Sequence, residues 1–207
     1  MDLLQTQKDK VSYSIGVNFG HMIKQQLAGV EVNSATFLKG IEASLNNDST
    51  LMTQDEMQKV LQEFQKEMEQ KISKQTEENK KIGEDFLAAN KKKEGVKVTK
   101  SGLQYKVIKS VKEGQIPKSS EKVKVHYAGT LIDGKEFDSS YKRGEPISFA
   151  VTGVIKGWTE ALQLMKVGEK WQLFIPSDLA YGQRGAGENI GPNQVLIFEV
   201  ELLGIEK

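Results

Sequence analysis

One feature constrains this chain more than any other: no glycine or proline occurs between Thr53 and Gly83. Thr53 and Glu56 have the spacing of a capping box, which marks the start of a helix. The helical pattern then continues to Glu94 and meets Gly95, a residue type that often follows the last turn of a helix. A helix of about 40 residues rises about 60 Å, roughly twice the diameter of a small domain. The sequence therefore predicts one long helix between two folded parts.

The two halves of this helix differ in how they can be buried. The first half carries an apolar stripe at helical spacing: Met57, Leu61, Phe64, Met68 and Ile72. Residues 73–81 contain no apolar side chain and have nothing to place in a core. We therefore expect a solvent-exposed stalk, whose far end docks on the second domain through Ile82, Phe86 and Leu87.

Residues 1–52 are predicted to be helical outside their turns. A first helix is expected from Val11 to Leu27, with apolar side chains on several faces that need more than one partner. A second is expected after Asn33 or Ser34, both good N-cap residues. These helices have too few residues to form a stable hydrophobic core within one chain. Symmetric dimers are the commonest oligomers, and pairing of two chains would bury the remaining apolar surface. We predict an N-terminal dimerisation domain, with a small three-helix monomer as the alternative.

From Val96 onwards the periodicity changes to that of strands. Apolar and polar residues alternate, as in strands with one buried face. Asp133 and Gly134 form a tight-turn signal, and a short amphipathic helix is expected over residues 157–165. The predicted class is α+β. Its parts are a helical dimerisation region (1–52), a long stalk helix (53–95) and an antiparallel sheet wrapped on a short helix (96–207).

Composition excludes several classes of function. The chain has 29 Lys and Arg against 28 Asp and Glu, which is not the basic excess expected of a nucleic-acid-binding protein. There are no cysteines, so thiolate chemistry and disulfides are unavailable. No apolar run approaches the ~18 residues of a membrane span, and the first residues do not form a signal peptide. Two locations stay open: the cytoplasm, or export with the signal replaced by Met1.

The chain also lacks the groups that most enzymes use for covalent or acid–base chemistry. Its two histidines, His21 and His126, have no triad-like partner, so structural roles are favoured for both. No spacing of residues suits a metal ion, and no cofactor is expected. The glycine-rich segment 182–187 lacks the lysine and hydroxyl residue of a phosphate-binding loop, and it is interpreted as a flexible loop.

Five aromatic residues are spread over separate segments of the strand-rich half: Tyr127, Phe137, Trp158, Tyr181 and Phe198. If they converge, they form a concave apolar pocket of the kind that binds small ligands. Their segments include Val-His-Tyr-Ala-Gly, Lys-Glu-Phe-Asp-Ser-Ser, Val-Ile-Lys-Gly-Trp and Ala-Tyr-Gly. In content and order these segments closely resemble the FK506-binding-protein (FKBP) family of peptidyl-prolyl cis/trans isomerases.

The resemblance implies an isomerase that assists protein folding by rotating the amide bond before proline. Rotation breaks the resonance of the amide, with a barrier of about 18–20 kcal/mol, and needs no acid, base or nucleophile. The resemblance implies Trp158 as the floor under the proline ring. The other implied substrate-binding residues form the walls, the rim and a closing loop: Tyr127, Phe137, Phe198, Val154, Ile155 and Ile190.

Two polar side chains are implied to be catalytic. The Tyr181 hydroxyl is the implied donor to the rotating amide and Asp138 the polar partner on the opposite edge, while the Ile155 N–H is offered to a ligand carbonyl. Three further residues are interpreted as core: Phe149, Leu173 and Leu196. Two departures from the family affect substrate preference and inhibitor affinity. Ile147 stands where many members have an aromatic residue, which is expected to reduce one wall, and the loop 183–192 has its own sequence.

The N-terminal half extends the resemblance to nearly the whole chain. Residues 8–16, 83–87 and 101–108 resemble the macrophage infectivity potentiator (Mip) subfamily of Gram-negative bacteria. That resemblance implies a V-shaped homodimer, paired through its N-terminal helices. It also implies export to the bacterial periplasm or the outer-membrane surface, with the signal peptide removed; a related cytoplasmic branch is the alternative.

The implied partners are unfolded or proline-containing polypeptides. The macrolide inhibitors rapamycin and tacrolimus are expected to bind as well. A second class of function stays open, in which the cleft of the dimer holds unfolded chains as a chaperone and isomerisation is secondary. Apolar faces at Met57, Met68 and the domain rims would carry the binding, because methionine adapts to varied partners.

Overall fold

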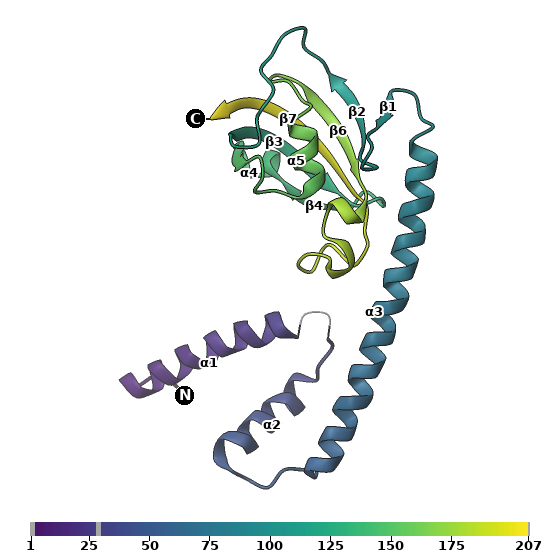
Figure 1. The fold of residues 1–207 in the computed structure, drawn as a ribbon. Helices are drawn as coiled ribbons and strands as arrows, with labels where there is room; N and C mark the ends of the chain where they lie inside the picture. Colours follow the sequence, from purple (N-terminus) through teal and green to yellow (C-terminus); the bar gives the residue numbers. More distant parts are fainter. Residues whose placement is uncertain (1–2, 28–29, 207) are drawn as a thin grey trace. The chain divides into compact units, whose positions relative to one another are not determined.

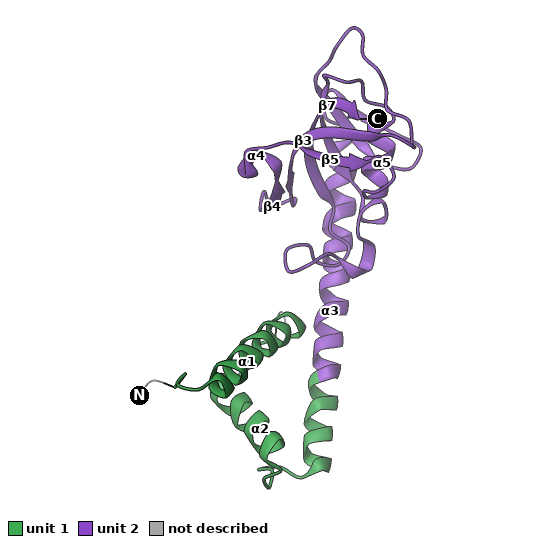
Figure 2. Ribbon diagram, turned by 90° about the vertical axis from the view of Figure 1, so that its left-hand side faces the viewer, with its two compact units in different colours: residues 1–64 green, residues 65–207 purple. Residues whose placement is uncertain are grey.

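The computed structural model describes residues 3–27 and 30–206. The chain divides into two compact units, residues 1–64 and 65–207 (Figure 2). The boundary lies within helix α3 (Gln54–Asn90), so this helix contributes residues to both units. Among the described residues, no helix has the length and apolar character that a membrane crossing requires.

The second unit contains one antiparallel sheet, as predicted for the α+β class. Its strands follow the order β1-β2-β6-β7-β3-β4, and β5 also pairs with β3. The predicted turn at Asp133 and Gly134 joins β3 to β4, with Gly134 in the left-handed region at φ 86°. The strands are β1 (Val96–Val98), β2 (Gln104–Lys109), β3 (Lys122–Thr130), β4 (Glu136–Ser139), β5 (Ile147–Ala150), β6 (Lys170–Ile175) and β7 (Leu196–Glu206).

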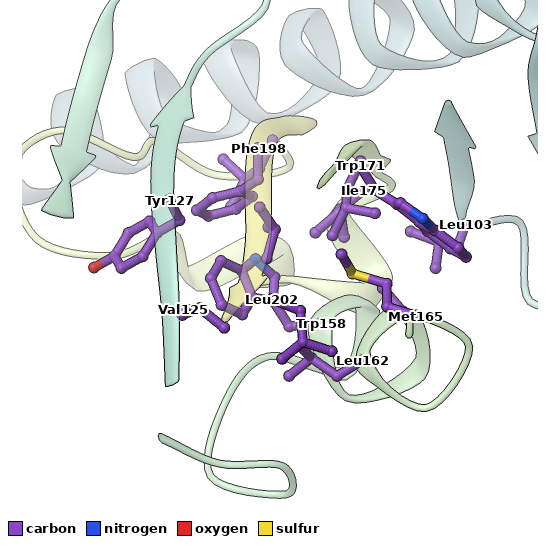
Figure 3. Packing of buried hydrophobic residues seen from close by; sticks show 14 of the residues in the cluster. Leu103, Val125, Tyr127, Trp158, Leu162, Met165, Trp171, Ile175, Phe198 and Leu202 are labelled. Carbon is purple, nitrogen blue, oxygen red and sulfur yellow. The ribbon is translucent and has the colours of Figure 1, made fainter. Parts of the chain in front are cut away.

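Short helices accompany the sheet: α4 (Ser140–Arg143), α5 (Lys156–Leu162) and the 3₁₀ turns η1 (Ser177–Leu179) and η2 (Gly182–Arg184). Helix α5 lies across one face of the sheet (Figure 1). It approaches closely because residue 157 is glycine: a Cβ there would lie 2.5 Å from Ile175 Cγ2. Apolar side chains of α5 and of that sheet face form one buried core (Figure 3), which includes the predicted core residues Leu173 and Leu196.

The first unit contains the start of α3 and two further helices: α1 (Gln7–Gln26) and α2 (Ser34–Asn46). Helix α1 begins earlier than the predicted Val11, because Thr6 and Asp9 form a capping box. Asn33 caps α2 as predicted, and its side chain accepts a hydrogen bond of 3.0 Å from the Thr36 amide. No residue of α1 or α2 is buried in the single chain.

Helix α3 starts where the sequence predicts but ends earlier. The Thr53 amide donates to the Glu56 carboxylate (2.8 Å) and the Glu56 amide to the Thr53 hydroxyl (3.3 Å), which is the predicted capping box. The predicted continuation up to Gly95 is wrong, since the last helical residue is Asn90. Its buried side chain donates to Gln104 Oε1 (3.0 Å), and this contact with β2 holds the chain where it leaves the helix.

The C-terminal part of α3 packs on the sheet. The Phe86 and Phe174 ring centroids are 6.1 Å apart, and the Leu87 carbonyl accepts a hydrogen bond of 2.9 Å from the Gln104 side chain. The predicted docking through Phe86 and Leu87 is therefore confirmed. Ile82 contributes less, because its side chain is 55% exposed.

The polar stretch 73–81 of α3 departs from the prediction that it lies wholly in solvent. Thr76 and Asn79 are partly buried, and both form hydrogen bonds with the loop before β7. The prediction failed because it considered only apolar packing, whereas polar helix residues can also satisfy the backbone groups of a loop.

Candidate functional site

One cavity of about 640 Å³ opens on the sheet domain. It brings together all nine residues predicted for the site, which come from strands, α5 and loops far apart in the sequence. Their roles in binding and catalysis stay predictions. The lining residues are Tyr127, Phe137, Asp138, Phe149, Gly153, Val154, Ile155, Trp158, Tyr181, Ala186, Gly187, Ile190 and Phe198.

The floor of the cavity is Trp158, whose side chain is only 4% exposed. The rings of Tyr127 and Phe198 meet it edge-on, with centroids 5.2 and 5.3 Å away. Tyr127 and Phe198 lie on the same face of the paired strands β3 and β7 (Figure 3). Phe198 pairs with Gly129, and Gly129 shares a face with Tyr127 because alternate residues of a strand do. Edge-to-face pairs each contribute about 0.5–1.5 kcal/mol beyond burial, so floor and walls form a well-defined unit.

Two walls of the cavity meet over a glycine of β3. The Phe137 and Phe198 rings pack edge to face, with centroids 5.4 Å apart. A Cβ on Gly129 would lie 2.6 Å from atoms of both rings. Glycine at this position therefore leaves the room that both aromatic walls occupy.

The polar edge of the cavity is a network of Tyr127, Asp138 and Arg143. The Tyr127 hydroxyl donates to the Asp138 carboxylate, and Arg143 donates to the same carboxylate and to the Tyr127 oxygen (2.9 Å). Burial raises the pKa of Tyr127, and its hydrogen bond to Asp138 adds to this. Burial opposes ionisation of Asp138, but the hydrogen bonds from Tyr127 and Arg143 outweigh it and lower the pKa of that carboxyl. Asp138 is thus held as a carboxylate and Tyr127 as a neutral donor.

The one-turn helix α4 places Arg143 in this network. The Ser139 hydroxyl caps the helix and accepts a hydrogen bond from the Lys142 amide (3.4 Å), and Gly144 ends it at φ 80°. Because the chain reverses over this single turn, the Arg143 guanidinium lies beside the carboxylate of Asp138. Sequence reasoning missed Arg143. The signals that could have found it are the serine that begins the turn, the glycine that ends it, and the opposite charges of Asp138, just before the turn, and Arg143, its last residue.

Sequence reasoning was also wrong about Phe149. It was interpreted as core only; it packs against the core but also lines the cavity, with its ring centroid 6.0 Å from that of Trp158. Ile147, expected to reduce one wall, packs against the core and is not among the lining residues. Three small residues of the lining carried no side-chain signal in the sequence: Gly153, Ala186 and Gly187.

The rim and the far side of the cavity are formed by loops. Ile155 is the N-cap residue of α5, and no backbone carbonyl among the described residues accepts a hydrogen bond from its amide. Tyr181 is 41% exposed, whereas Ile190 is buried. In the part of the chain that the structure describes, no His, Cys, Asp and Glu side chains cluster as they would around a metal ion.

Comparison with known proteins relates the chain to one family. Residues 113–203 match the family model described as FKBP-type peptidyl-prolyl cis-trans isomerase, and residues 8–107 match that of the domain amino-terminal to it. The chain is 47% identical to the outer membrane protein MIP of Legionella longbeachae, over 99% of this chain and 88% of that protein. The chain belongs to the FKBP-type peptidyl-prolyl cis-trans isomerases.

Two further relatives agree with this assignment. The isomerase is 43% identical to the FKBP-type 22 kDa peptidyl-prolyl cis-trans isomerase of Escherichia coli, over 97% of this chain and 96% of that one. A crystal structure of FkpA from Escherichia coli aligns with it at a TM-score of 0.68, with 36% identity over 98% of both chains. The protein is an enzyme of the FKBP type, with a helical N-terminal region, a long helix and an antiparallel sheet domain.

Proposed function

We propose that the cavity catalyses rotation of X-Pro amides in unfolded or flexible polypeptides by stabilising the twisted amide. The observation that carries the proposal is the aromatic enclosure around Trp158 with a polar edge at Asp138. Rotation breaks amide resonance and leaves a less polar group, so a dry aromatic cavity favours the twisted state over the planar one. The uncatalysed reaction takes tens of seconds or longer, which is slow enough to limit folding.

The proposed roles are those that the resemblance to the family implies for residues that line the cavity. The proline ring stacks on Trp158, and the Ile155 amide donates to a carbonyl of the bound chain. The Tyr181 hydroxyl donates to the rotating amide. The Asp138 carboxylate, held ionised by Arg143, is the fixed charge on the opposite edge. Only contacts that strengthen as the amide twists increase the rate.

The direct test is isomerisation of a short X-Pro peptide by the wild type beside Asp138→Asn and Tyr181→Phe. We expect kcat/KM to fall about tenfold for Asp138→Asn, because a charged hydrogen-bond partner is lost, and about threefold to tenfold for Tyr181→Phe, because a neutral one is lost. Rapamycin, a ligand expected to fill the cavity, should inhibit the wild type.

Tyr141→Phe is the matched control for removal of a phenol hydroxyl. Tyr141 is stacked on His126 outside the cavity, and its hydroxyl donates weakly to Glu201 at 3.4 Å. This variant should keep wild-type kcat/KM. An inactive but folded wild type, or two cavity variants as active as Tyr141→Phe, would contradict the proposed mechanism.

The pH profile offers a second test. The pKa of Asp138 lies below its ordinary value of 3.8 and that of Tyr127 above its ordinary value of 10.0. From about pH 5 to about pH 9 neither group therefore changes its protonation state. Because the folded-state pKa of Asp138 is depressed, its stabilising contribution is present above the unfolded-state pKa and is lost as the pH falls through the folded-state pKa. Protonation of Asp138 also removes the fixed charge at the cavity edge. We therefore expect kcat/KM to decline as the pH falls toward the pKa of Asp138, and to stay constant from about pH 5 to about pH 9.

Arg143→Met should move this acid decline to higher pH, because the guanidinium helps to lower the pKa of Asp138. Lys142→Met is the control, since its ammonium pairs with Glu136 (2.8 Å) and not with Asp138. The wild type and both variants are measured by kcat/KM between about pH 3 and about pH 9, because the pKa of Asp138 in the wild type lies below 3.8. An unshifted acid limb in Arg143→Met would argue against this role of the network.

We also propose that the isomerase is a homodimer through its N-terminal helices. Large apolar side chains of α1 are about half exposed in the single chain: Val11, Ile15, Phe19 and Met22. They recur at helical spacing and form one face of the helix. Tyr13 and Val17 are exposed on another face, so one partner helix does not suffice to cover α1. An intertwined pair of chains satisfies both faces.

A chaperone role is the second candidate function. The exposed apolar side chains of the first unit favour it, because they are suited to bind unfolded chains as well as a second copy. Asp138→Asn separates the two activities. If binding of unfolded chains is independent of isomerisation, this variant should still suppress aggregation of a denatured protein while its isomerase activity falls. Loss of both activities in this variant would remove the support for a separate chaperone function.

For location we propose the bacterial envelope. The support is the name of the Legionella longbeachae relative, an outer membrane protein. The cytoplasm is the alternative. Fractionation of the native host with an antibody to the protein decides between them.

A further inference from the structure

A loop of residues 182–193, the cavity loop, forms one side of the proposed proline site. Three of its residues line the cavity: Ala186, Gly187 and Ile190. Ala186 and Ile190 exchange both of their backbone hydrogen bonds, at 2.8 and 3.1 Å. The two end residues of the loop are joined by an amide-to-carbonyl bond of 2.8 Å. The loop is thus closed on itself, but these bonds alone do not attach it to the rest of the unit.

Helix α3 lies beside the cavity loop (Figure 1) and bonds to it through residues that do not line the cavity. Asn79 Nδ2 donates to the Pro192 carbonyl at 2.7 Å, and Asn193 Nδ2 donates to the Thr76 carbonyl at 3.4 Å. We call these two bonds the helix–loop contact. All four residues belong to the same compact unit. The contact uses the stretch of α3 that has no apolar side chain, so hydrogen bonds are the interaction it can offer.

Asn193, the loop residue of the helix–loop contact, suits this contact in its backbone conformation and its burial. Asn193 has a left-handed backbone at φ 53°, a conformation that asparagine adopts more readily than most residues. It is only 7% exposed, and a buried amide side chain is costly unless it is hydrogen-bonded. The helix–loop contact supplies that bond.

We propose that Asn79 is a positioning residue for the isomerase: through Pro192 it fixes the cavity loop, and with it Ile190, against the bound substrate. This inference rests on the proposed function of the cavity. A loosened loop binds the planar and the twisted substrate less tightly to a similar degree. Loss of the contact therefore raises KM and leaves kcat nearly unchanged.

The test uses the full-length chain with Asn79→Asp, which keeps the shape of the side chain, removes its N–H donor and places a carboxylate beside the Pro192 carbonyl. We expect KM for a short X-Pro peptide to rise about tenfold, because a hydrogen bond is lost and two acceptors then face each other, with kcat within about twofold. Amide hydrogen exchange should become faster in residues 182–193 and stay unchanged in β7. A merely structural defect would lower the melting temperature without this split between KM and kcat.

Two companion variants make the test specific. Gln75→Glu is the matched control, because it makes the same amide-to-carboxylate change at an exposed residue of the same polar stretch of α3, and it should behave as wild type. Asn193→Gly removes the opposite side-chain amide while glycine keeps the left-handed backbone without strain. It should change KM and loop exchange in the same direction as Asn79→Asp.

The outcomes distinguish this inference from the function on which it rests. If wild type is active and Asp138→Asn is impaired, but Asn79→Asp and Asn193→Gly keep wild-type KM and loop exchange, the positioning role is overturned and the proposed function stands. If Asp138→Asn is unimpaired, the proposed mechanism fails instead. Faster loop exchange in both contact variants with unchanged KM would also overturn the positioning role, because the loop would then be mobile without consequence for the substrate.

Discussion

Substitution of Gly129 by alanine is expected to lower kcat/KM on the order of a hundredfold. The added Cβ would lie 2.6 Å from ring atoms of both Phe137 and Phe198, so at least one wall has to move. Because Phe198 packs edge-on to Trp158, its displacement also disturbs the floor. A misplacement of about 1 Å at a reacting group can cost this much. Overpacking should also reduce the free energy of unfolding by about 1–3 kcal/mol.

The matched control is Gly204→Ala in the same sheet. Gly204 lies in β7, and a Cβ there would meet no atom within 4 Å. This variant should keep wild-type activity and stability within about 0.5 kcal/mol. Peptide isomerisation and chemical denaturation measure both effects. A Gly129→Ala enzyme with wild-type kcat/KM would show that the two rings relax without cost, and that their observed arrangement is unnecessary for catalysis.

Local signals in the sequence account for most of the fold. The capping box of Thr53 and Glu56 and the N-cap Asn33 depend on residues only a few positions apart, so they could be predicted without tertiary information. The turn at Gly134 and the strand alternation from Val96 onwards are equally local. The convergence of the aromatics is a different matter, because it came from the order of several motifs that resemble one family.

The failures occurred where a distant partner decides the outcome. Helix α3 ends at Asn90, whose side chain bonds to Gln104 on a neighbouring strand, a contact that no helix-end rule includes. Asn79 looked like a solvated helix residue because its partner lies on a loop more than a hundred positions away. Phe149 has the alternation of a core residue, and only the position of α5 shows that it faces the cavity. Periodicity predicts which face is apolar, but not what covers it.

A single charge on α1 is expected to convert the isomerase from a dimer to a monomer. Phe19 is 55% exposed in the single chain and is the largest side chain of the apolar face of α1 formed with Val11, Ile15 and Met22. If that face is the dimer interface, Phe19→Asp buries a carboxylate without a partner, at a cost of several kcal/mol per ion. There are two such carboxylates in a symmetric dimer, so the dissociation constant should rise more than a thousandfold. Light scattering should then give about half of the wild-type mass.

The control places the same charge outside the first unit, as Gln75→Asp on the polar stretch of α3, where the native side chain is already polar and exposed. This variant should stay dimeric. Monomeric Phe19→Asp should keep wild-type kcat/KM on short peptides, because the cavity lies wholly within the second unit. It should refold long clients more slowly, since two tethered sites raise the effective concentration on one chain. A monomeric wild type would refute the dimer, whereas a dimeric Phe19→Asp would place its interface on another face of the helices.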